Sequence, residues 1–589
     1  MAKSRKILGL IGLVLAMFMG ALDATIVNIV LPNIMEELHT GLTDTSWVAT
    51  IYVLAMSVFI ITVSKLADIY GRKLVMLIGV VIFGIFSFAC MMADSLLLLI
   101  IFRFFQGIGG AILTPIVLPM GIELLGKENT SHITAIMGAF SALAAAGGPV
   151  IGGLIVHWTT YHWIFGINVP IAIFAFLMIL VGTKESYDLT ISKNIDWLGI
   201  IFLTCTLGGL TFGLLEGHEY GWGSQTIIAS FVISVVGLFF LILTERKAKS
   251  PIIDLKLFKE STFTSSSIIY MIFGFAIIVP SLILNYFLQN VRNYSALHSA
   301  YLIIPTSLAI VVGMPLATKM YQKISARLLI SIGLVITAGG LFMLSLVEYN
   351  TSQSIIVCCN VIIGLGLGFM AMTLTSSVKY LPVIKTGIGS GIVNASRYIG
   401  QAIGMAILVT ILNSNVNIAK TQIKETAYNQ IEKRILSTDV KKVAKKEIAK
   451  TFETTKNSNS ISTKQSRMVK TIKRTTQKTD KLPVPKKGSQ YRKIYDANQL
   501  LINGVETVSS SVPQLSASLR TISGGQVKVG TAIKLLAQKD ELTAALKVIV
   551  KEKNEQLSRA FDNVFLVGTI IVLICTPLAL MTEKKKMYN

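Results

Sequence analysis

Charged residues are scarce in this chain. Of its 589 residues, 14% are charged and 52% are hydrophobic, and the mean hydropathy is +0.66. A single water-soluble core does not hide that much apolar surface, so these values exclude a soluble globular protein. The bilayer is the natural solvent for such a composition.

The residues from which disulfide frameworks, metal sites and nucleotide sites are built are also few. All five cysteines lie within apolar stretches, and none of the six histidines is spaced as a metal pair, which argues against disulfides and metals. No loop of the type GxxxxGK[ST] occurs, so the chain carries no evident ATPase. We therefore expect neither an enzyme nor a cofactor, and the energy must come from an ion gradient or a partner.

Long apolar stretches are what the chain does contain. A spanning helix needs roughly 20 mostly apolar residues, and fourteen such windows alternate with polar connectors. The sequence therefore predicts an all-α polytopic membrane protein. The windows cover about residues 7–31, 47–63, 74–92, 96–119, 133–156, 163–181, 197–215, 226–243, 266–288, 300–317, 328–347, 355–374, 387–412 and 564–580.

Lysine and arginine in the short connectors set the expected orientation, because these residues favour the cytoplasmic side. With the N-terminus inside, the even-numbered connectors carry basic residues such as Lys65 and Lys73, whereas the outer connectors carry acids such as Asp94. We therefore expect a multi-pass protein of the cell membrane with both termini in the cytoplasm.

The windows divide into six, two and six helices. The basic connector after the second span has a weaker counterpart after the tenth, and the glycine-rich fourth span is matched by the twelfth. Repeated halves are typical of alternating-access transporters, which bind substrate near the midplane. The expected parts are a six-helix bundle at 1–184, two inserted spans at 185–260, five spans of a second bundle at 261–414, a hydrophilic segment at 415–560, and the last span with its tail at 561–589.

The hydrophilic segment, residues 415–560, holds most of the net charge. It has 29 Lys and Arg against 12 Asp and Glu, an excess of 17 out of the chain's +23. The orientation places this segment outside the cell, and loops beyond about 60 residues escape the positive-inside bias. Because the excess charge lies outside, we do not expect nucleic-acid binding.

The second arm of this segment is periodic. Apolar residues follow steps of four and three over residues 501–536, which predicts a heptad seam. The first arm, residues 418–452, has a more irregular helical pattern. Both arms adjoin spans, so we expect an antiparallel helical stalk, partly a coiled coil, that Pro513 and the pair Gly524 and Gly525 kink or interrupt.

Ionisable groups inside apolar spans are costly, so each one suggests a function. Asp23 in the first span and Arg103 in the fourth lie at the same depth, roughly 10–12 Å below the outer surface. Burial raises the pKa of a carboxyl group and a nearby guanidinium lowers it, so Asp23 can exchange a proton as the cation approaches or leaves. The alternative is a static ion pair that holds helices together.

A cluster of small residues and a proline lies in the fifth span. Small residues let helices approach closely, and proline removes a backbone hydrogen bond, so the cluster favours a deformable contact. Generic helix packing also explains such clusters. The members are Gly148, Pro149, Gly152 and Gly153.

Two further polar groups stand out. Asp68 and Arg72, in the connector after the second span, form either a charge lock with helix-end dipoles that breaks on switching, or a topology anchor. In the thirteenth span Arg397 has Asn394 and Gln401 at neighbouring turns. Substrate lining and helix packing explain this polar stripe equally well.

Six stretches resemble motifs of one transporter family. They read LDATIVNIVLP, LAD with GRK, R with QG, GP with GG, WIFGINVP and DWLG, at residues 22–32, 66–73, 103–107, 148–153, 163–170 and 196–199. The first is similar to the helix 1 signature of the fourteen-helix drug:proton antiporter branch of the major facilitator superfamily. The second resembles the connector motif of that superfamily, the third its proton-transfer motif and the fourth its antiporter motif.

The resemblance implies a major facilitator fold, two six-helix bundles with two inserted central helices, that exports hydrophobic or amphipathic, often cationic, toxic compounds in exchange for protons. It implies proton coupling or substrate binding at Asp23, Arg103 and Gln106, and a conformational switch at Asp68, Gly71, Arg72 and the fifth-span cluster. We add possible substrate lining at Asn28, Asn394, Arg397 and Gln401. The expected partners are the amphipathic small molecule, protons and membrane lipids.

Two other functions stay open. The first is an exporter or flippase of a lipid or envelope component, with residues 415–560 binding an anionic polymer or lipid head groups, although the charges also serve simply to keep that segment soluble. The second is a non-transporting envelope scaffold, against which the retained Asp23 and Arg103 argue.

Overall fold

The computed structural model describes most of the chain, and every regular element in the described residues is a helix. The contacts divide these helices into two units. The first consists of Met1–Gln289, Asn293–Leu412 and Phe561–Asn589, and the second of Asn290–Arg292 and Asn413–Ala560. The described residues are 3–40, 42–186, 196–248, 251–253, 255–321, 323–381, 385–453, 482–511 and 516–583.

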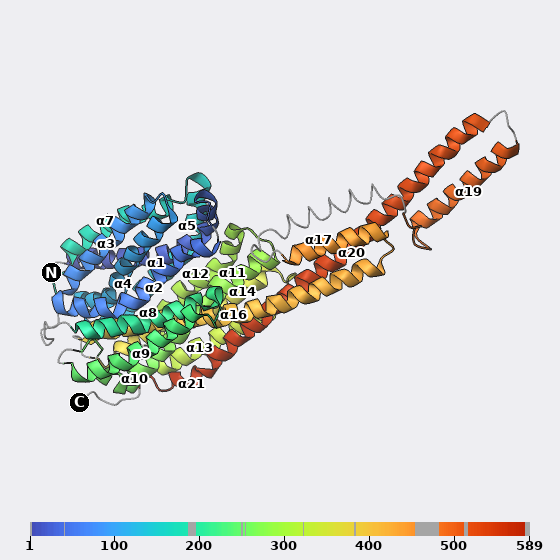
Figure 1. The fold of residues 1–589 in the computed structure, drawn as a ribbon. Helices are drawn as coiled ribbons and strands as arrows, with labels where there is room; N and C mark the ends of the chain where they lie inside the picture. Colours follow the sequence, from blue (N-terminus) through green and yellow to red (C-terminus); the bar gives the residue numbers. More distant parts are fainter. Residues whose placement is uncertain are drawn as a thin grey trace. The chain divides into compact units, whose positions relative to one another are not determined.

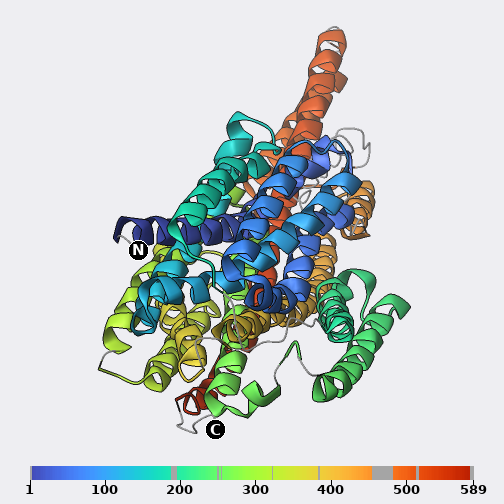
Figure 2. The same cartoon turned by 90° about the vertical axis from the view of Figure 1, so that its left-hand side faces the viewer.

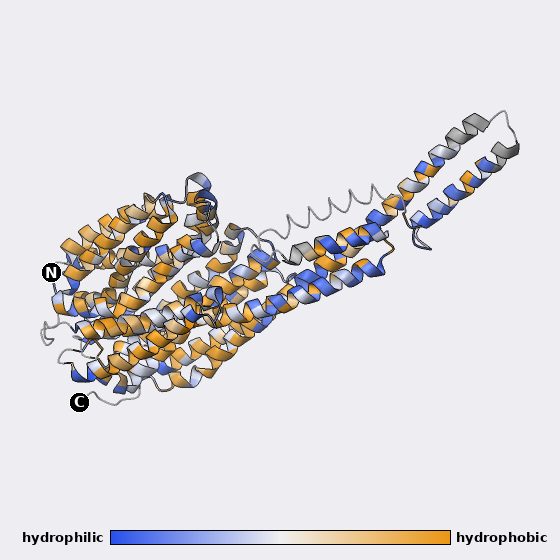
Figure 3. Cartoon of the chain, in the orientation of Figure 1, coloured by the Kyte–Doolittle hydropathy of each residue, from blue (hydrophilic) through white to orange (hydrophobic). Residues whose placement is uncertain are grey.

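Fourteen helices in the described residues are long and apolar enough to cross a membrane. This confirms the predicted fold class and the predicted number of spans. Their large apolar side chains also face outward, as on α9 (Gln225–Lys247), where Val235 is 67% exposed and Phe239 is 60% exposed. Such side chains are stable there when the solvent is lipid, and Figure 3 shows how hydrophobic residues cover the spanning helices.

The N-terminal bundle of the first unit is built from helices α1 to α7, most of which are labelled in Figure 1. In this bundle α1 packs against α4, α5 and α7, while α4 also contacts α2 and α3. Since α2 also contacts α1, the helices α2, α4, α5 and α7 all pack against α1. The helices are α1 (Lys3–Glu37), α2 (Leu42–Tyr70), α3 (Arg72–Met91), α4 (Leu96–Leu125), α5 (Thr130–Trp158), α6 (Trp163–Gly166) and α7 (Asn168–Gly182).

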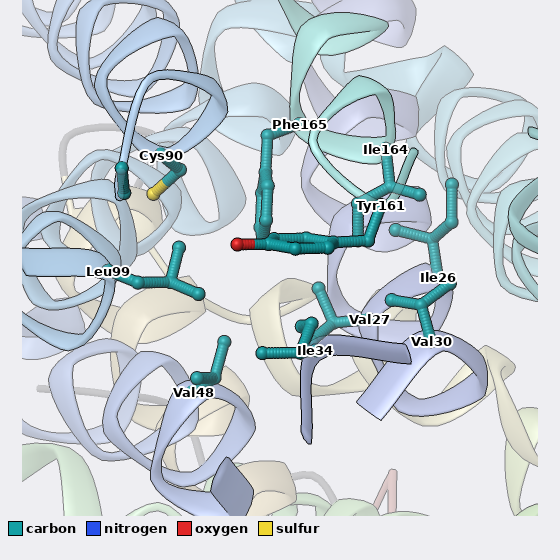
Figure 4. Packing of buried hydrophobic residues seen from close by; sticks show 11 residues of the cluster. Ile26, Val27, Val30, Ile34, Val48, Cys90, Leu99, Tyr161, Ile164 and Phe165 are labelled. Atoms are coloured by element: carbon teal, nitrogen blue, oxygen red, sulfur yellow. The ribbon is translucent and has the colours of Figure 1, made fainter. Parts of the chain in front are cut away.

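An apolar cluster fills one end of this bundle (Figure 4). It joins Ile34 near the end of α1, Val48 near the start of α2 and Leu99 near the start of α4. Tyr161 and Phe165, from the turn and short helix before α7, lie among them, and both are at most 1% exposed. The cluster therefore fixes the ends of several helices in one apolar contact.

The two central spans, α8 (Trp197–Tyr220) and α9, pair with each other, and α8 also contacts α2. They appear in green in Figure 2. Both helices begin with a capped first turn, because Asp196 accepts a hydrogen bond from the Gly199 N–H and Ser224 accepts one from the Ile227 N–H. The capping residue in the sequence therefore marks the start of each of these two helices.

The remaining spans form the C-terminal bundle. Here α14 packs against α12 and α13, and α10 packs against α15, while α12 also contacts α5 of the N-terminal bundle. The helices are α10 (Ser261–Ile278), α11 (Leu284–Tyr286) between π turns at Val279–Ile283 and Phe287–Val291, α12 (Ala296–Tyr321), α13 (Ala326–Leu344), α14 (Gln353–Met370), α15 (Met372–Val378), α16 (Thr386–Lys433), the last part of α20 (Ser516–Ile574) and α21 (Thr576–Ala579).

The second unit is a helical assembly of its own. Its core joins the last part of α16, α17 (Thr438–Glu453) and α20 through side chains such as Ile431, Val440 and Leu542. Gln538 of α20 provides hydrogen-bond partners for the backbone between α16 and α17. Its side chain accepts from the Ser437 N–H at 2.9 Å and donates to the Ile435 carbonyl at 2.6 Å. Further along, α19 (Gln490–Ser511) lies beside α20 (Figure 1).

Two expectations about this unit were wrong. The helix α20 runs without interruption through Gly524 and Gly525, because glycine weakens a helix but, unlike proline, removes no hydrogen bond. The predicted seam is not buried along its described length, since Leu501 is 58% exposed and Val529 is 51% exposed while Ile533 is buried. Pro513 lies outside the described residues, between the end of α19 and the start of α20.

Candidate functional site

A buried polar cluster surrounds Asp23 in the N-terminal bundle. Its carboxylate pairs with the Arg103 guanidinium of α4, accepts from the Gln106 amide at 3.1 Å and accepts from the Asn168 amide of α7 at 2.9 Å. Gln106 also donates to the Ser87 hydroxyl of α3 at 2.7 Å. All five side chains are at most 1% exposed, and we call them the Asp23 cluster.

Arg103 is held in place by α2 as well as by Asp23. Its Nε donates to the Val48 carbonyl at 2.9 Å, and the Tyr52 ring lies 4.2 Å from the guanidinium carbon. Glycines on α4 make this possible: a Cβ on Gly107 would lie 2.8 Å from the Tyr52 carbonyl oxygen, and one on Gly110 would lie 2.8 Å from its hydroxyl. The glycine pattern thus brings α2 against α4 and seats a cation on an aromatic face.

The chemistry of the Asp23 cluster is that of a buried, neutralised ion pair. Removing Arg103 from the carboxylate would leave a charge in an apolar interior, which proton binding to Asp23 would neutralise. The Oδ1 atom of Asn168 is buried without a hydrogen-bond partner among the described residues. It is a buried acceptor whose hydrogen-bonding capacity no described donor uses.

Sequence reasoning found Asp23, Arg103 and Gln106, and the structure brings all three together. It missed Asn168 and Ser87 as members of this cluster. Asn168 carries the clearer signal, since it is a lone amide inside the apolar stretch 163–181. A single serine in a span has no such signal, because serine often serves helix packing.

A second buried cluster lies where α2 ends and α3 begins. Asp68 accepts from the Arg72 guanidinium at 2.8 and 2.9 Å, and Arg72 also pairs with Glu123 of α4. The other carboxylate oxygen of Asp68 accepts from the backbone N–H of Ile388 at 3.2 Å, in the first turn of α16. Nearby, the Ser64 hydroxyl donates to the Gly387 carbonyl at 2.7 Å.

We call Asp68, Arg72, Glu123 and the Gly387–Ile388 backbone the Asp68 cluster. Asp68 and Arg72 lie in buried helix ends rather than in an exposed connector, with exposed fractions of 1% and 3%. A carboxylate at the N-terminus of α16 is favoured by the helix dipole and by the N–H groups of the first turn, which have no acceptor within the helix. The cluster therefore links the two bundles through a charged contact.

Gly71 makes the sharp turn between α2 and α3. Its φ is +115°, and a Cβ there would lie 2.6 Å from the Glu185 carboxylate, so only glycine fits without strain. Glu185 caps α3, because it accepts from the backbone N–H groups of Lys73 at 2.9 Å and Leu74 at 3.0 Å. Sequence reasoning missed Glu185 and Glu123, which look like ordinary charges near span ends.

The small residues of α5 contact two helices. A Cβ on Gly148 would clash with the Thr25 hydroxyl of α1. Gly153 faces α12, where a Cβ on this glycine would lie 3.7 Å from the Leu297 side chain. Gly152 is buried, and the side chain of Pro149 lies outside the described ones. Thus α5 separates α1 from the C-terminal bundle with little side-chain bulk.

Among the described lining residues, no hydrogen bond joins Asn394, Arg397 and Gln401 to one another. Asn394 donates to the Ser390 carbonyl of its own helix at 2.9 Å, and Gln401 is partly buried. Arg397 is hydrogen-bonded to Tyr398 at 3.0 Å. The side chain of Asn28 lies outside the described part. Within that part, no group of three or more His, Cys, Asp or Glu side chains could hold a metal ion.

Several known proteins are similar to this chain in sequence or in fold. The family model of the Major Facilitator Superfamily matches residues 13–405, so most of the second unit lies beyond the match. The multidrug transporter protein MdtP of Bacillus subtilis is 31% identical over 414 residues, which is 70% of this chain and 76% of the relative. The multidrug resistance protein Stp of Mycobacterium tuberculosis is 32% identical over 416 residues, 69% of this chain and 76% of the relative.

A third relative is the tetracenomycin C resistance and export protein of Streptomyces glaucescens. It is 28% identical over 408 residues, 69% of this chain and 76% of the relative. Among solved structures, the human organic anion transporter MFSD10 (TETRAN) superposes with a TM-score of 0.52 at 12% identity. The match covers 69% of this chain and 93% of that chain, and it shows the shared fold.

Proposed function

The chain belongs to the major facilitator superfamily, and we propose that this transporter exports small amphipathic compounds from the cell in exchange for protons. The relatives whose names include multidrug transport, multidrug resistance and export support this choice. The observation that carries proton exchange is the buried Asp23 carboxylate, which has an arginine and two amides as partners.

In the proposed cycle Asp23 alternates between two partners, the Arg103 cation and a proton. When a proton binds Asp23, the ion pair loses its attraction, and Arg103 keeps its bonds to Val48 and Gln106. When the proton leaves, the ion pair forms again. Coupling follows if substrate binding and protonation of Asp23 exclude each other.

Alternating access requires contacts that form on only one side at a time. We place the Asp68 cluster on the cytoplasmic side, with both termini, because the basic connectors favour that side. Contacts between the bundles at this end include Asp68 with Ile388, Ser64 with Gly387, and the Lys127 ammonium with the Leu381 carbonyl at 3.0 Å. In this assignment the structure is a state closed toward the cytoplasm.

The test uses everted membrane vesicles that contain the full-length protein. Addition of an amphipathic dye, with ethidium as a cation and fluorescein as an anion, should trigger proton movement for at least one of them, and a proton gradient should drive uptake of that dye. Asp23→Asn, which keeps the shape but fixes the neutral state, should reduce both by at least about 100-fold. The matched control is Asp94→Asn, an exposed carboxylate between α3 and α4, which should behave like the wild type. Unchanged exchange in Asp23→Asn would refute the role of Asp23.

A second function is export of a lipid or envelope component assisted by the second unit. One observation favours it: α17 buries Val440, Ala444 and Ile448 while Lys442 and Lys446 are exposed. Such a basic face suits anionic head groups or an anionic polymer. The full-length protein in neutral nanodiscs should then bind teichoic acid at low salt, and the pair Lys442→Gln and Lys446→Gln should weaken it. Teichoic acid binding by this variant equal to that of the wild type would refute this second function.

A further inference from the structure

Arg397 in α16 is a cation without an acidic partner in the described part of the chain. Its Nη2 donates to the Tyr398 hydroxyl at 3.0 Å, while its Nε is buried and has no hydrogen-bond partner among the described residues. The described groups that act on it electrostatically are the two tyrosines Tyr398 and Tyr270, and no carboxylate is among them. An arginine inside a membrane span without an acidic partner is costly and therefore points to a ligand.

Arg103 shows what a satisfied arginine looks like in the same protein. It has a carboxylate partner in Asp23, a carbonyl in Val48 and an amide oxygen in Gln106. The Asp23 cluster is therefore neutral, whereas Arg397 adds one positive charge that no described carboxylate compensates. Arg397 can therefore form with a bound anion the kind of ion pair that Arg103 forms with Asp23.

The packing of α10 against α16 places Arg397 beside aromatic surface. A Cβ on Gly274 of α10 would clash with the Arg397 carbonyl, so the two backbones approach as closely as glycine allows. Tyr270, one turn earlier on α10, is buried, and its ring stacks on Phe273 with centroids 5.1 Å apart. The Arg397 side chain itself is only partly buried.

Arg397 is connected, through its neighbour on α16, to the aromatic ring that packs on Arg103. Tyr398, its hydrogen-bond partner, is within electrostatic reach of Tyr52, whose ring packs on Arg103. A substrate bound between the bundles near Arg103 would therefore meet Arg397 as well. In the proposed export function, Arg397 would then line the transport path.

We infer that Arg397 binds an anionic head group, so that the exported substrate is an amphipathic organic anion such as a carboxylate or sulfonate. The planar guanidinium offers paired donors that match such a group, and Tyr270 and Tyr398 provide aromatic surface for its apolar body. The inference rests on the proposed export function and names the substrate class for it.

The test compares two dyes with one ring system and opposite charge, fluorescein as the anion and rhodamine 6G as the cation. Full-length protein in proteoliposomes should transport fluorescein when a proton gradient is imposed. Arg397→Gln should lower this rate at least tenfold. Arg397→Lys keeps the charge but loses the paired N–H donors of the guanidinium, so its rate should lie between those of the wild type and Arg397→Gln. Arg327→Gln removes an exposed arginine at the start of α13 and should match the wild type.

Rhodamine 6G separates the two ways in which the test can fail. If the wild type moves rhodamine 6G with the proton gradient but not fluorescein, the inference fails and the export function stands. If neither dye moves, both fail. If Arg397→Gln keeps wild-type elution and melting temperature yet loses both dyes equally, Arg397 has a general role and the anion assignment is overturned. Fluorescein transport by Arg397→Gln within twofold of the wild type also overturns it.

Discussion

An arginine pairs with an aspartate twice inside the N-terminal bundle, once in the Asp23 cluster and once in the Asp68 cluster. Both aspartates are at most 1% exposed, and both arginines make further hydrogen bonds. The pairs differ in the origin of their other partners. The carboxylate of Asp23 contacts α4 and α7 of its own bundle, whereas that of Asp68 also contacts α16 of the other bundle.

This difference separates two tasks. A cluster that is complete within one bundle keeps its geometry while the bundles move, so it can hold or release a proton in either state. A cluster shared between bundles breaks when they part, so it sets the balance between states. In the proposed cycle the Asp23 cluster therefore carries the proton and the Asp68 cluster carries the switch.

The substitution Arg103→Gln tests the difference between the Asp23 cluster and the Asp68 cluster most strongly. The substitution leaves the Asp23 carboxylate buried without a cation, and breaking a buried pair costs about 3–5 kcal/mol. We expect a clearly lower melting temperature of the purified protein and no dye-driven proton movement. The double variant with Asp23→Asn leaves neither charge, so it should recover most of the stability and none of the coupling. A single variant as stable as the wild type would contradict the buried pair.

Gly148→Ala tests whether the Asp23 cluster depends on the close contact between α1 and α5. A Cβ there clashes with the Thr25 hydroxyl, and overpacking of this kind costs about 1–3 kcal/mol. We expect a lower melting temperature and slower transport. Gly147→Ala is the matched control, since the only atom near its Cβ among those described is Ile151 of the same helix, at 3.4 Å. Equal effects of both variants would exclude a specific contact.

Asp68→Asn should shift the balance between states without unfolding the protein. It weakens the bond from Asp68 to the Ile388 N–H of the other bundle, and a hydrogen bond to a charged group is worth about 1.5 kcal/mol, or roughly tenfold in population. The measurement is maleimide labelling of Ser64→Cys, at a side chain 1% exposed between the bundles, in a chain without its five cysteines. Labelling should speed up about tenfold. Asp44→Asn, exposed at the start of the same helix, should leave the rate unchanged.

Composition was sufficient to predict the spanning helices, because lipid imposes the same apolar pattern on every span. Asp23 and Arg103 were also predictable, since a charge within a span is rare enough to stand out alone. Asn168, Ser87 and Glu123 were not, because their roles depend on which helices pack together. Neutral polar residues in spans and acids at span ends serve many purposes, and only the packing shows which side chains they meet.

The second unit shows a different reason for failure. A heptad count follows one helix, but the chain leaves α19 at Ser511 and enters α20 at Ser516, so residues before and after this point belong to different helices. The periodic pattern therefore does not describe a single seam. The break at Ser437 was equally hidden, because the side chain that satisfies its backbone, Gln538, is about a hundred residues away in sequence.

The smallest effect is expected at a third ion pair, between Lys379 after α15 and Glu583 near the end of the chain. Their charged atoms are 2.6 Å apart, and Glu583 also accepts from the Tyr321 hydroxyl at 3.1 Å. Unlike the two buried arginines, the Lys379 side chain is 39% exposed, so water screens the pair and Lys379→Gln should cost less than about 1 kcal/mol.

The pH dependence of this pair has a definite sign. Burial lowers the pKa of the Lys379 ammonium, but hydrogen bonds with Glu583 and Tyr321 raise it by more, so its pKa lies above the ordinary value. A lysine whose pKa is raised on folding contributes its full stabilisation at pH values below its unfolded pKa, about 10.4. This contribution is lost only as the pH rises through the folded pKa. The melting-temperature difference between wild type and Lys379→Gln should therefore stay constant from about pH 6 to about pH 9 and shrink in high salt. A difference as large as that of Arg103→Gln would mean that exposure does not distinguish the pairs.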